Sequence, residues 1–238
     1  MNTLELKSAS PILTIEPALL EGKRLLTKEE IAILESQRNQ STNNWEYFYV
    51  DEELFDINCV HGNIFSGWVV LGKLSKATLK YHDLVLDCGI YNSDIKNCVI
   101  GDYNVIKNVA YLDNYRLKNR VMLFNIKEMS CTNHSKFGNG IIKEGEPDSH
   151  RVWIGVGNEN DGRAVLAFEN MIPADAYLWS HYRNDDDVLN RFIEITDAQF
   201  PHSLDTYGTV DDDAVIKNSN IIKDVKIGQA AYIKGAFK

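Results

Sequence analysis

The sequence predicts a mainly β protein, a parallel β-helix with an N-terminal helical cap and a large α-containing insertion. Three observations predict this class. Hydrophobic residues return at every sixth position from Val215 to the end of the chain. A helix-start signal precedes the first such repeat. A stretch without the repeat, residues 125–208, then separates two stretches that have it.

The C-terminal repeat favours strands over a helix. Val215, Ile221, Ile227 and Ile233 hold one slot of the six-residue period. In an α-helix, six steps of about 100° carry this slot around the cylinder, so that no single apolar stripe forms. In a strand, six is a multiple of the side-chain period, and every member of the slot points to the same side. Such periods are typical of parallel β-helices, in which short strands stack coil upon coil.

Three consecutive hexads also carry a family resemblance: Val215-Ile-Lys-Asn-Ser-Asn, Ile221-Ile-Lys-Asp-Val-Lys and Ile227-Gly-Gln-Ala-Ala-Tyr. They resemble the hexapeptide-repeat family. The resemblance implies a left-handed, triangular β-helix with three hexads per coil. It also implies an acyltransferase that forms a homotrimer, binds no resident cofactor and uses acetyl-CoA or acyl-carrier protein as donor.

The whole chain further resembles an uncharacterised family of bacterial proteins that continue into a longer hexapeptide solenoid. The sequence stops at Ala236-Phe237-Lys238 with the repeat still running. We therefore predict that the chain is the N-terminal part of a longer protein, or that another copy covers its last coil.

Four regions follow from these patterns. Residues 1–60 are expected to cap the first coil, because the helix signal of Thr27 and Glu30 precedes any hexad. Residues 61–124 are predicted to form coils of the β-helix, although two alignments of the six-residue repeat, offset by one residue, both fit this stretch. Residues 125–208 form the insertion, and residues 209–238 resume the coils, which we expect to be truncated.

The aromatic cluster around Trp45 and Phe48 is predicted to pack in a core, the alternative being a ligand cleft.

Charge and hydropathy exclude several classes of partner. The 238 residues carry 25 Lys and Arg against 34 Asp and Glu, a net charge of −9, without a basic run. We therefore expect neither nucleic acid nor a membrane as a partner. Residues 1–15 lack the apolar segment of a secretory signal, so a cytoplasmic protein is expected. The cysteines form no CxxC pair and are predicted to be buried free thiols: Cys59, Cys88, Cys98 and Cys131.

Acyl transfer needs a base that takes a proton from the attacking acceptor, which directs attention to the histidines. His134 stands in the stretch Asn133-His-Ser-Lys-Phe-Gly-Asn-Gly140. This stretch resembles, with one residue fewer, the His-x-x-x-x-Gly-Asn sequence around the catalytic histidine of sugar-nucleotide acyltransferases of the hexapeptide family. The resemblance implies that His134 is the catalytic base and that the acceptor is a sugar or sugar nucleotide. His150 is the second candidate, because Asp148-Ser-His-Arg151 places an acid, a base and a cation together.

Other residues of the insertion complete this hypothesis. Arg151 and Arg163 suit a phosphate, because a guanidinium can grip an anion with two hydrogen bonds; the alternative is that both are surface arginines. Asn133 is expected to bind substrate, and backbone amides near Gly138 and Gly140 are expected to hold the oxyanion.

No metal site is predicted. Asp185, Asp186 and Asp187 begin a predicted helix, where the helix dipole favours carboxylates, and are interpreted as capping residues. Pro173 is expected in the first turn of the helix before it. The competing hypothesis to the transferase is a non-catalytic β-helix that binds a carbohydrate or scaffolds a partner through the insertion.

Overall fold

The computed structural model describes residues 15–157 and 162–237. The chain divides into two compact units. The coil unit comprises Met1–Cys131 and Tyr207–Lys238, and the inserted unit comprises Thr132–Thr206. Within the described ranges, no helix combines the length and the apolar character needed to cross a bilayer.

Short strands make up most of the coil unit. In chain order they are β1 (Lys23–Leu25), β2 (Gln40–Ser41), β3 (Phe48–Asp51), β4 (Val60–His61), β5 (Ile64–Leu71), β6 (Thr78–Tyr81), β7 (Leu84–Asp87), β8 (Gly89–Tyr91), β9 (Asp94–Ile100), β10 (Val105–Val109), β11 (Leu112–Asp113), β12 (Tyr115–Leu117), β13 (Met122–Ser130), β16 (Gly208–Val210), β17 (Val215–Lys223), β18 (Lys226–Ile227) and β19 (Tyr232–Lys234). Its helical elements are η1 (Pro17–Leu20), α1 (Lys28–Ser36) and η2 (Ile57–Cys59). The inserted unit contains η3 (Asp148–His150), β14 (Trp153–Gly155), β15 (Ala164–Leu166), α2 (Pro173–His181) and α3 (Asp186–Gln199).

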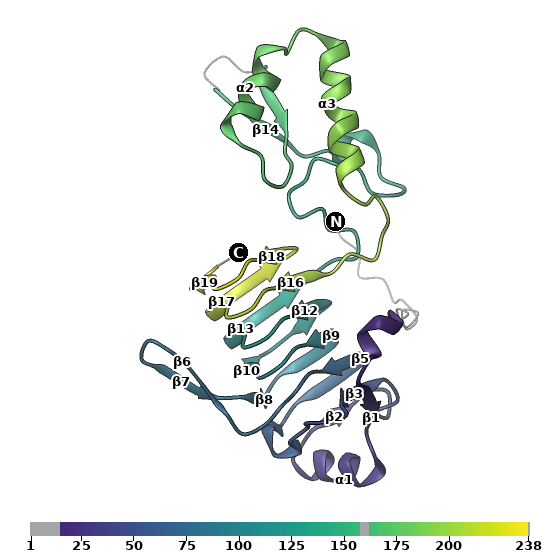
Figure 1. Cartoon of the computed structure of the whole chain (residues 1–238), viewed down its shortest axis with the longest axis vertical. Helices are drawn as coiled ribbons and strands as arrows, with labels where there is room; N and C mark the ends of the chain where they lie inside the picture. Colours follow the sequence, from purple (N-terminus) through teal and green to yellow (C-terminus); the bar gives the residue numbers. More distant parts are fainter. Residues whose placement is uncertain (1–14, 158–161, 238) are drawn as a thin grey trace, which may run out of the picture. The chain divides into compact units, whose positions relative to one another are not determined.

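Fifteen strands of the coil unit form one mixed, curled sheet (Figure 1). Near its start, β1 runs antiparallel to β3. Later strands pair in parallel, as β10 does with β13, β13 with β17 and β17 with β19. The predicted fold class, a left-handed parallel β-helix, is therefore wrong. The unit is mainly β, but its sheet is mixed and its turns do not repeat as regular hexads.

The backbone corners explain why the hexads are irregular. Asn108, Asn114, Arg120 and Asn125 occupy successive corners in the left-handed region, with φ between 55° and 57°. The chain therefore runs six, six and then five residues from corner to corner. Equivalent residues of neighbouring coils, such as Asn108 and Asn125, consequently lie 17 positions apart, one fewer than three hexads require.

The short third segment moves the buried aliphatic position by one residue in each coil. Ile222 is 6% exposed, whereas Ile221, which the six-residue repeat assigned to the core, is only half-buried. Ile227, five positions after Ile222, is again buried. This shift is the physical origin of the two competing frames in the sequence.

The N-terminal region of the coil unit confirms the predicted helix start. The Thr27 hydroxyl accepts a hydrogen bond from the Glu30 amide, and the Glu30 carboxylate accepts one from the Thr27 amide. This capping box satisfies two amides that α1 would leave unpaired. Trp45 and Phe48 are buried, and Phe48 packs edge-to-face against Phe65. The aromatic cluster therefore belongs to the core and not to a ligand cleft.

All four cysteines are buried and free. Burial raises the pKa of Cys98 to about 12 and that of Cys59 to about 11. Because the charged thiolate is disfavoured without water, both side chains remain neutral thiols at physiological pH.

The inserted unit has a small core of its own. Val165, Leu166 and Trp179 are buried at its centre, and the apolar face of α3 packs against them. Pro173 occupies the first turn of α2, and the Asp185 carboxylate accepts a hydrogen bond from the Val188 amide at the start of α3. Both helix starts confirm the sequence predictions.

A close approach between β12 and β16 gives a test of packing in the coil unit. Gly208 pairs in register with Tyr115, whose side chain is fully buried, and a methyl group at residue 208 would overlap the Tyr115 ring. We expect Gly208→Ala to lower the free energy of unfolding by about 1–3 kcal/mol, measured by urea denaturation.

Gly228→Ala is the matched control, because an added methyl group there meets nothing within 4 Å. Its free energy of unfolding should change by no more than about 0.5 kcal/mol. Equal destabilisation by the two substitutions would contradict the packing argument.

Candidate functional site

The predicted base, His134, lies on the surface of the inserted unit. Its Nδ1 is 3.0 Å from Oδ1 of Asn133, which is also exposed. The Asn133 carbonyl accepts a hydrogen bond of 2.9 Å from the Thr206 amide. Among the described residues, His134 thus contacts no second polar side chain that would orient it as a general base.

His150 ends η3, and its side chain is 59% exposed. Its Nδ1 is 3.9 Å from Oε1 of Glu146, and its carbonyl accepts a hydrogen bond from Lys136. Burial opposes ionisation of Glu146, but hydrogen bonds from Lys136 and Lys143 hold the pKa of Glu146 below its usual value. Within the described ranges, no hydrogen bond or ion pair joins His150 to His134.

The two arginines differ in their environments. Arg151 is 12% exposed and binds both carboxylate oxygens of Asp197 at 2.8 Å. Its guanidinium also donates to the Gly140 carbonyl at 3.2 Å, so its donors are engaged within the unit. Arg163 is exposed beside Gly157 in the β14–β15 hairpin.

Gly140 and Gly138, the predicted oxyanion residues, have structural roles in packing and in a turn. The Gly140 amide donates a hydrogen bond of 2.6 Å to the Ala167 carbonyl, so this amide is not free for an oxyanion. A methyl group at residue 140 would overlap Leu166. Gly138 is exposed in a left-handed turn with φ of 81°. All the predicted site residues therefore lie in the inserted unit, but no hydrogen bond or ion pair within the described ranges joins them into a catalytic site. Acyl transfer stays a prediction.

Sequence reasoning missed a regular polar surface on the coil unit. Asn92, Asn108, Asn125 and Asn218 occupy equivalent corners of successive coils, with φ between 49° and 57°, and all four are exposed. Their side-chain amides are joined end to end, at 3.4 Å, 3.4 Å and 3.2 Å in chain order. We call these four residues the asparagine row.

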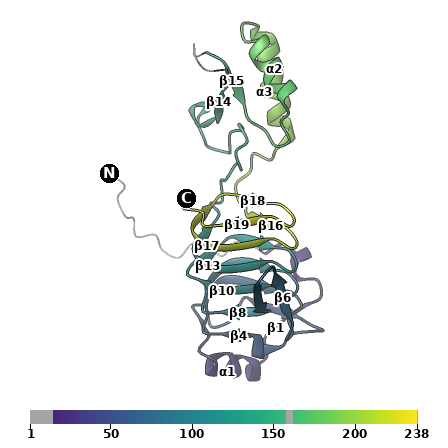
Figure 2. The same ribbon diagram turned by 90° about the vertical axis from the view of Figure 1, so that its left-hand side faces the viewer.

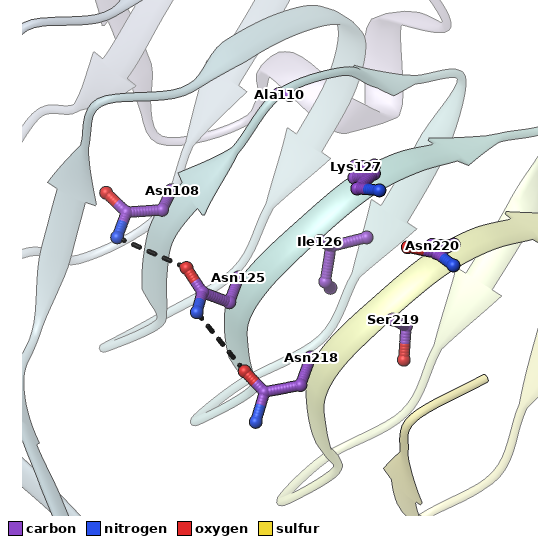
Figure 3. Close-up of a pocket in the computed structure, with 8 residues that line it drawn as sticks. All are labelled: Asn108, Ala110, Asn125, Ile126, Lys127, Asn218, Ser219 and Asn220. Carbon is purple, nitrogen blue, oxygen red and sulfur yellow. Dashed lines mark hydrogen bonds between the residues drawn. The ribbon is translucent and has the colours of Figure 1, made fainter. Parts of the chain in front are cut away.

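A shallow groove of about 360 Å³ lies beside the asparagine row (Figure 3). Asn108, Asn125 and Asn218 line it on one side, and Lys127 and Asn220, from the strand segments that follow these corners, line it on the other. Buried Ile126 and Ser219 lie beneath. The groove is therefore rich in amides, with one ammonium group.

The spacing of the asparagine row along the sequence explains why a six-residue period does not reveal it. Asn108 and Asn125 are 17 positions apart, whereas Asn125 and Asn218 are 93 apart, because the inserted unit intervenes. A search for six-residue periods does not align these positions. The signal that could identify these positions is asparagine itself, because asparagine, like glycine, tolerates the left-handed conformation that a corner requires.

A second set of side chains runs next to the asparagine row. Residues in register on neighbouring strands form what we call the lysine–aromatic column: Tyr91, Lys107, Phe124, Lys217 and Lys234. The Lys217 ammonium lies 5.5 Å from the centre of the Tyr232 ring. Tyr232 in turn contacts Tyr81 of the β6–β7 hairpin, with ring centroids 4.9 Å apart, and Figure 2 shows this hairpin in front of the strands. The hairpin thus borders the column.

The Arg151–Asp197 pair gives a stability test for the inserted unit. We expect Arg151→Met to lower the free energy of unfolding by about 1–3 kcal/mol, because a part-buried carboxylate loses two charge-assisted hydrogen bonds. Thermal denaturation of the whole chain measures this. Arg191→Met is the control, since Arg191 and Glu194 are 70% and 65% exposed, and its effect should be within about 0.5 kcal/mol.

The same pair predicts a pH dependence. The hydrogen bond from Arg151 holds the pKa of Asp197 below its usual value of 3.8. A carboxyl group whose pKa is lower in the folded state stabilises the protein above the unfolded value and loses that effect as the pH falls through the folded value. The stability difference between the native chain and Asp197→Asn should therefore shrink below about pH 4. A difference that widens on acidification would contradict this.

A family model built from known proteins matches most of the chain. The model of a domain of unknown function, DUF4954, matches residues 23–238. An uncharacterized protein of Treponema pallidum (strain Nichols) is 38% identical over 215 residues, which cover 90% of this chain and 29% of that relative. The chain thus spans less than a third of the relative's length. No solved structure matches the chain.

The family match corrects the resemblance drawn from the hexads of residues 215–232. Assignment to the hexapeptide-repeat acyltransferases is wrong, because the matching family is a different one and the apparent hexads come from corners spaced six, six and five residues apart. The family model extends over nearly the whole chain, across both the coil unit and the inserted unit. The chain belongs to the DUF4954 family.

Proposed function

We propose that the coil unit is a carbohydrate-binding module that holds an extended glycan chain in the groove beside the asparagine row. The observation that carries this proposal is the row itself, with three exposed amides on one side of the groove. These amides are joined to one another at 3.2–3.4 Å, at or beyond the long end of the usual range for hydrogen bonds. Exchanging such bonds for bonds to ligand hydroxyls costs little.

Amide chemistry suits sugar hydroxyls. Each asparagine offers one carbonyl oxygen as acceptor and two N–H donors, and a hydroxyl group can both donate and accept. Asn220 repeats this pattern within the groove, and Lys127 adds three donors. A pair of neighbouring hydroxyl groups can therefore be held by one amide through two hydrogen bonds.

The repetition of the row favours a chain over a single sugar. Asparagine stands at the same corner in successive coils, and neighbouring strands lie roughly 4.8 Å apart, so the same contacts recur along the stack. Tyr91 and Phe124 are half-buried in the adjacent column. Apolar ring faces can pack against the C–H faces of sugars, which supplements the hydrogen bonds.

Asn125→Gly combined with Asn218→Gly tests the proposal. Glycine keeps the left-handed backbone of both corners but removes the amides. We expect an affinity loss of about tenfold or more, since each lost hydrogen bond contributes about 0.5–1.5 kcal/mol. Isothermal titration against soluble polysaccharides that the native chain binds measures the change.

Asn97→Gly is the matched control, because Asn97 has the same residue type and a φ of 51° at a different corner. It should leave the affinity unchanged. Unaltered affinity in the double variant, or a native chain that binds no member of a broad polysaccharide panel, would overturn the proposed function.

A further inference from the structure

The cations of the coil unit differ in their pairing. Seven of them face a carboxylate within 4 Å: Lys23, Arg24, Lys73, Lys96, Arg116, Lys118 and Arg120. Five others are exposed and form no ion pair within the described ranges: Lys28, Arg38, Lys76, Lys80 and Lys223. Lys107, Lys127, Lys217 and Lys234 form no ion pair with any residue in the described ranges, although the chain has a net charge of −9. All four lie along the asparagine row or its groove.

Register brings these lysines together. Lys217 and Lys234 are direct partners in the parallel β17–β19 ladder, roughly 4.8 Å apart along the sheet. Like charges placed opposite each other on neighbouring strands are destabilising. Lys107 is in the same column, separated from Lys217 by Phe124. The ammonium of Lys217 also lies over the Tyr232 ring, which partly holds its position.

The carboxylate next to Lys127 in sequence already has a hydrogen-bond partner. Glu128, next to Lys127 in sequence, is in register with Ile221 and accepts a hydrogen bond from the Ser130 hydroxyl. Tyr91, at the end of the column, has its pKa raised to about 12 by burial and donates its hydroxyl proton to the Cys88 carbonyl, so it carries no charge at neutral pH. The surface therefore combines a surplus of positive charge with exposed amides.

We infer that the glycan bound by the coil unit is anionic, with carboxylate or phosphate groups that pair with Lys217, Lys234 and Lys107 while its hydroxyl groups bind the asparagine row. This inference rests on the proposed function. A bound anion between Lys217 and Lys234 would convert their mutual repulsion into two attractions. Because the lysines recur along the same stack as the amides, a polymer with repeated charges matches both sets at once.

Matched pairs of polysaccharides test the inference. Polygalacturonate and alginate are compared with their carboxyl-reduced forms, and a phosphorylated mannan with the same mannan after phosphatase treatment, by isothermal titration with the full chain. We expect each acidic polymer that binds to do so at least tenfold more tightly than its neutral form, with an affinity that falls as salt rises. The carboxylate and phosphate pairs show which anion is preferred.

Lys217→Gln combined with Lys234→Gln should reduce the affinity for the acidic polymer at least tenfold and leave the affinity for the neutral form unchanged. The melting temperature should not fall, because removal of two like charges in register relieves repulsion. Lys28→Gln combined with Lys223→Gln removes the same charge from exposed positions outside the column and should have no effect on binding.

The outcomes separate the two proposals. Equal affinity for acidic and neutral forms, with dependence on Asn125 and Asn218, overturns the anionic inference and leaves the carbohydrate function standing. Absence of binding to every polymer overturns both. If a single-stranded polynucleotide binds as tightly as the acidic glycans do, the inference is also overturned, because the surface would then recognise negative charge and not the sugar.

Discussion

The coil unit depends on a backbone that turns through the left-handed region at each corner. This conformation costs most residues roughly 1–2 kcal/mol, whereas glycine adopts it freely and asparagine tolerates it. At one corner, Gly62 and Gly235 bracket the asparagine row, with φ of 69° and 71°. The need for a sharp turn therefore selects the residue type, and where the corner faces solvent the selected side chain becomes a surface feature.

Buried asparagines that directly follow left-handed corners, Asn39 and Asn63, use their amides for a different purpose. The Asn63 amide donates to Asn39 Oδ1 at 3.1 Å, and the Ser93 amide donates to Asn63 Oδ1 at 2.9 Å. Each coil thus supplies an acceptor for a backbone N–H group that the parallel ladder leaves unpaired in its neighbour. The side-chain amides of the asparagine row are exposed and are hydrogen-bonded to one another. That difference separates amides that stabilise the fold from amides that can bind a ligand.

The inserted unit separates in sequence the two strands that form the groove, but these strands still pair with each other in the sheet. β13 precedes the insertion and β17 follows it, yet the two strands pair in parallel from Met122 with Val215 to Ser130 with Lys223. Closely spaced hydrogen bonds and ion pairs, such as Arg120 with Asp213, fix this register. Loop-closure entropy grows only slowly with length, so a long excursion at a corner is tolerated when its ends are held so firmly. Asn125 and Asn218 consequently stand side by side in the groove.

The sequence by itself determined the features that depend on near neighbours. The capping box of Thr27 and Glu30, the first-turn Pro173 and the Asp185 cap each involve residues within a few positions, and all were predictable. The mainly β character and the burial of the cysteines also followed from composition and spacing. Only the tertiary structure decided the corner spacing, the core position of Ile222 in place of Ile221, and the pairing of Arg151 with Asp197. It also decided the groove, since stacking joins asparagines 17 or 93 positions apart, and no local pattern specifies which corner lies above which.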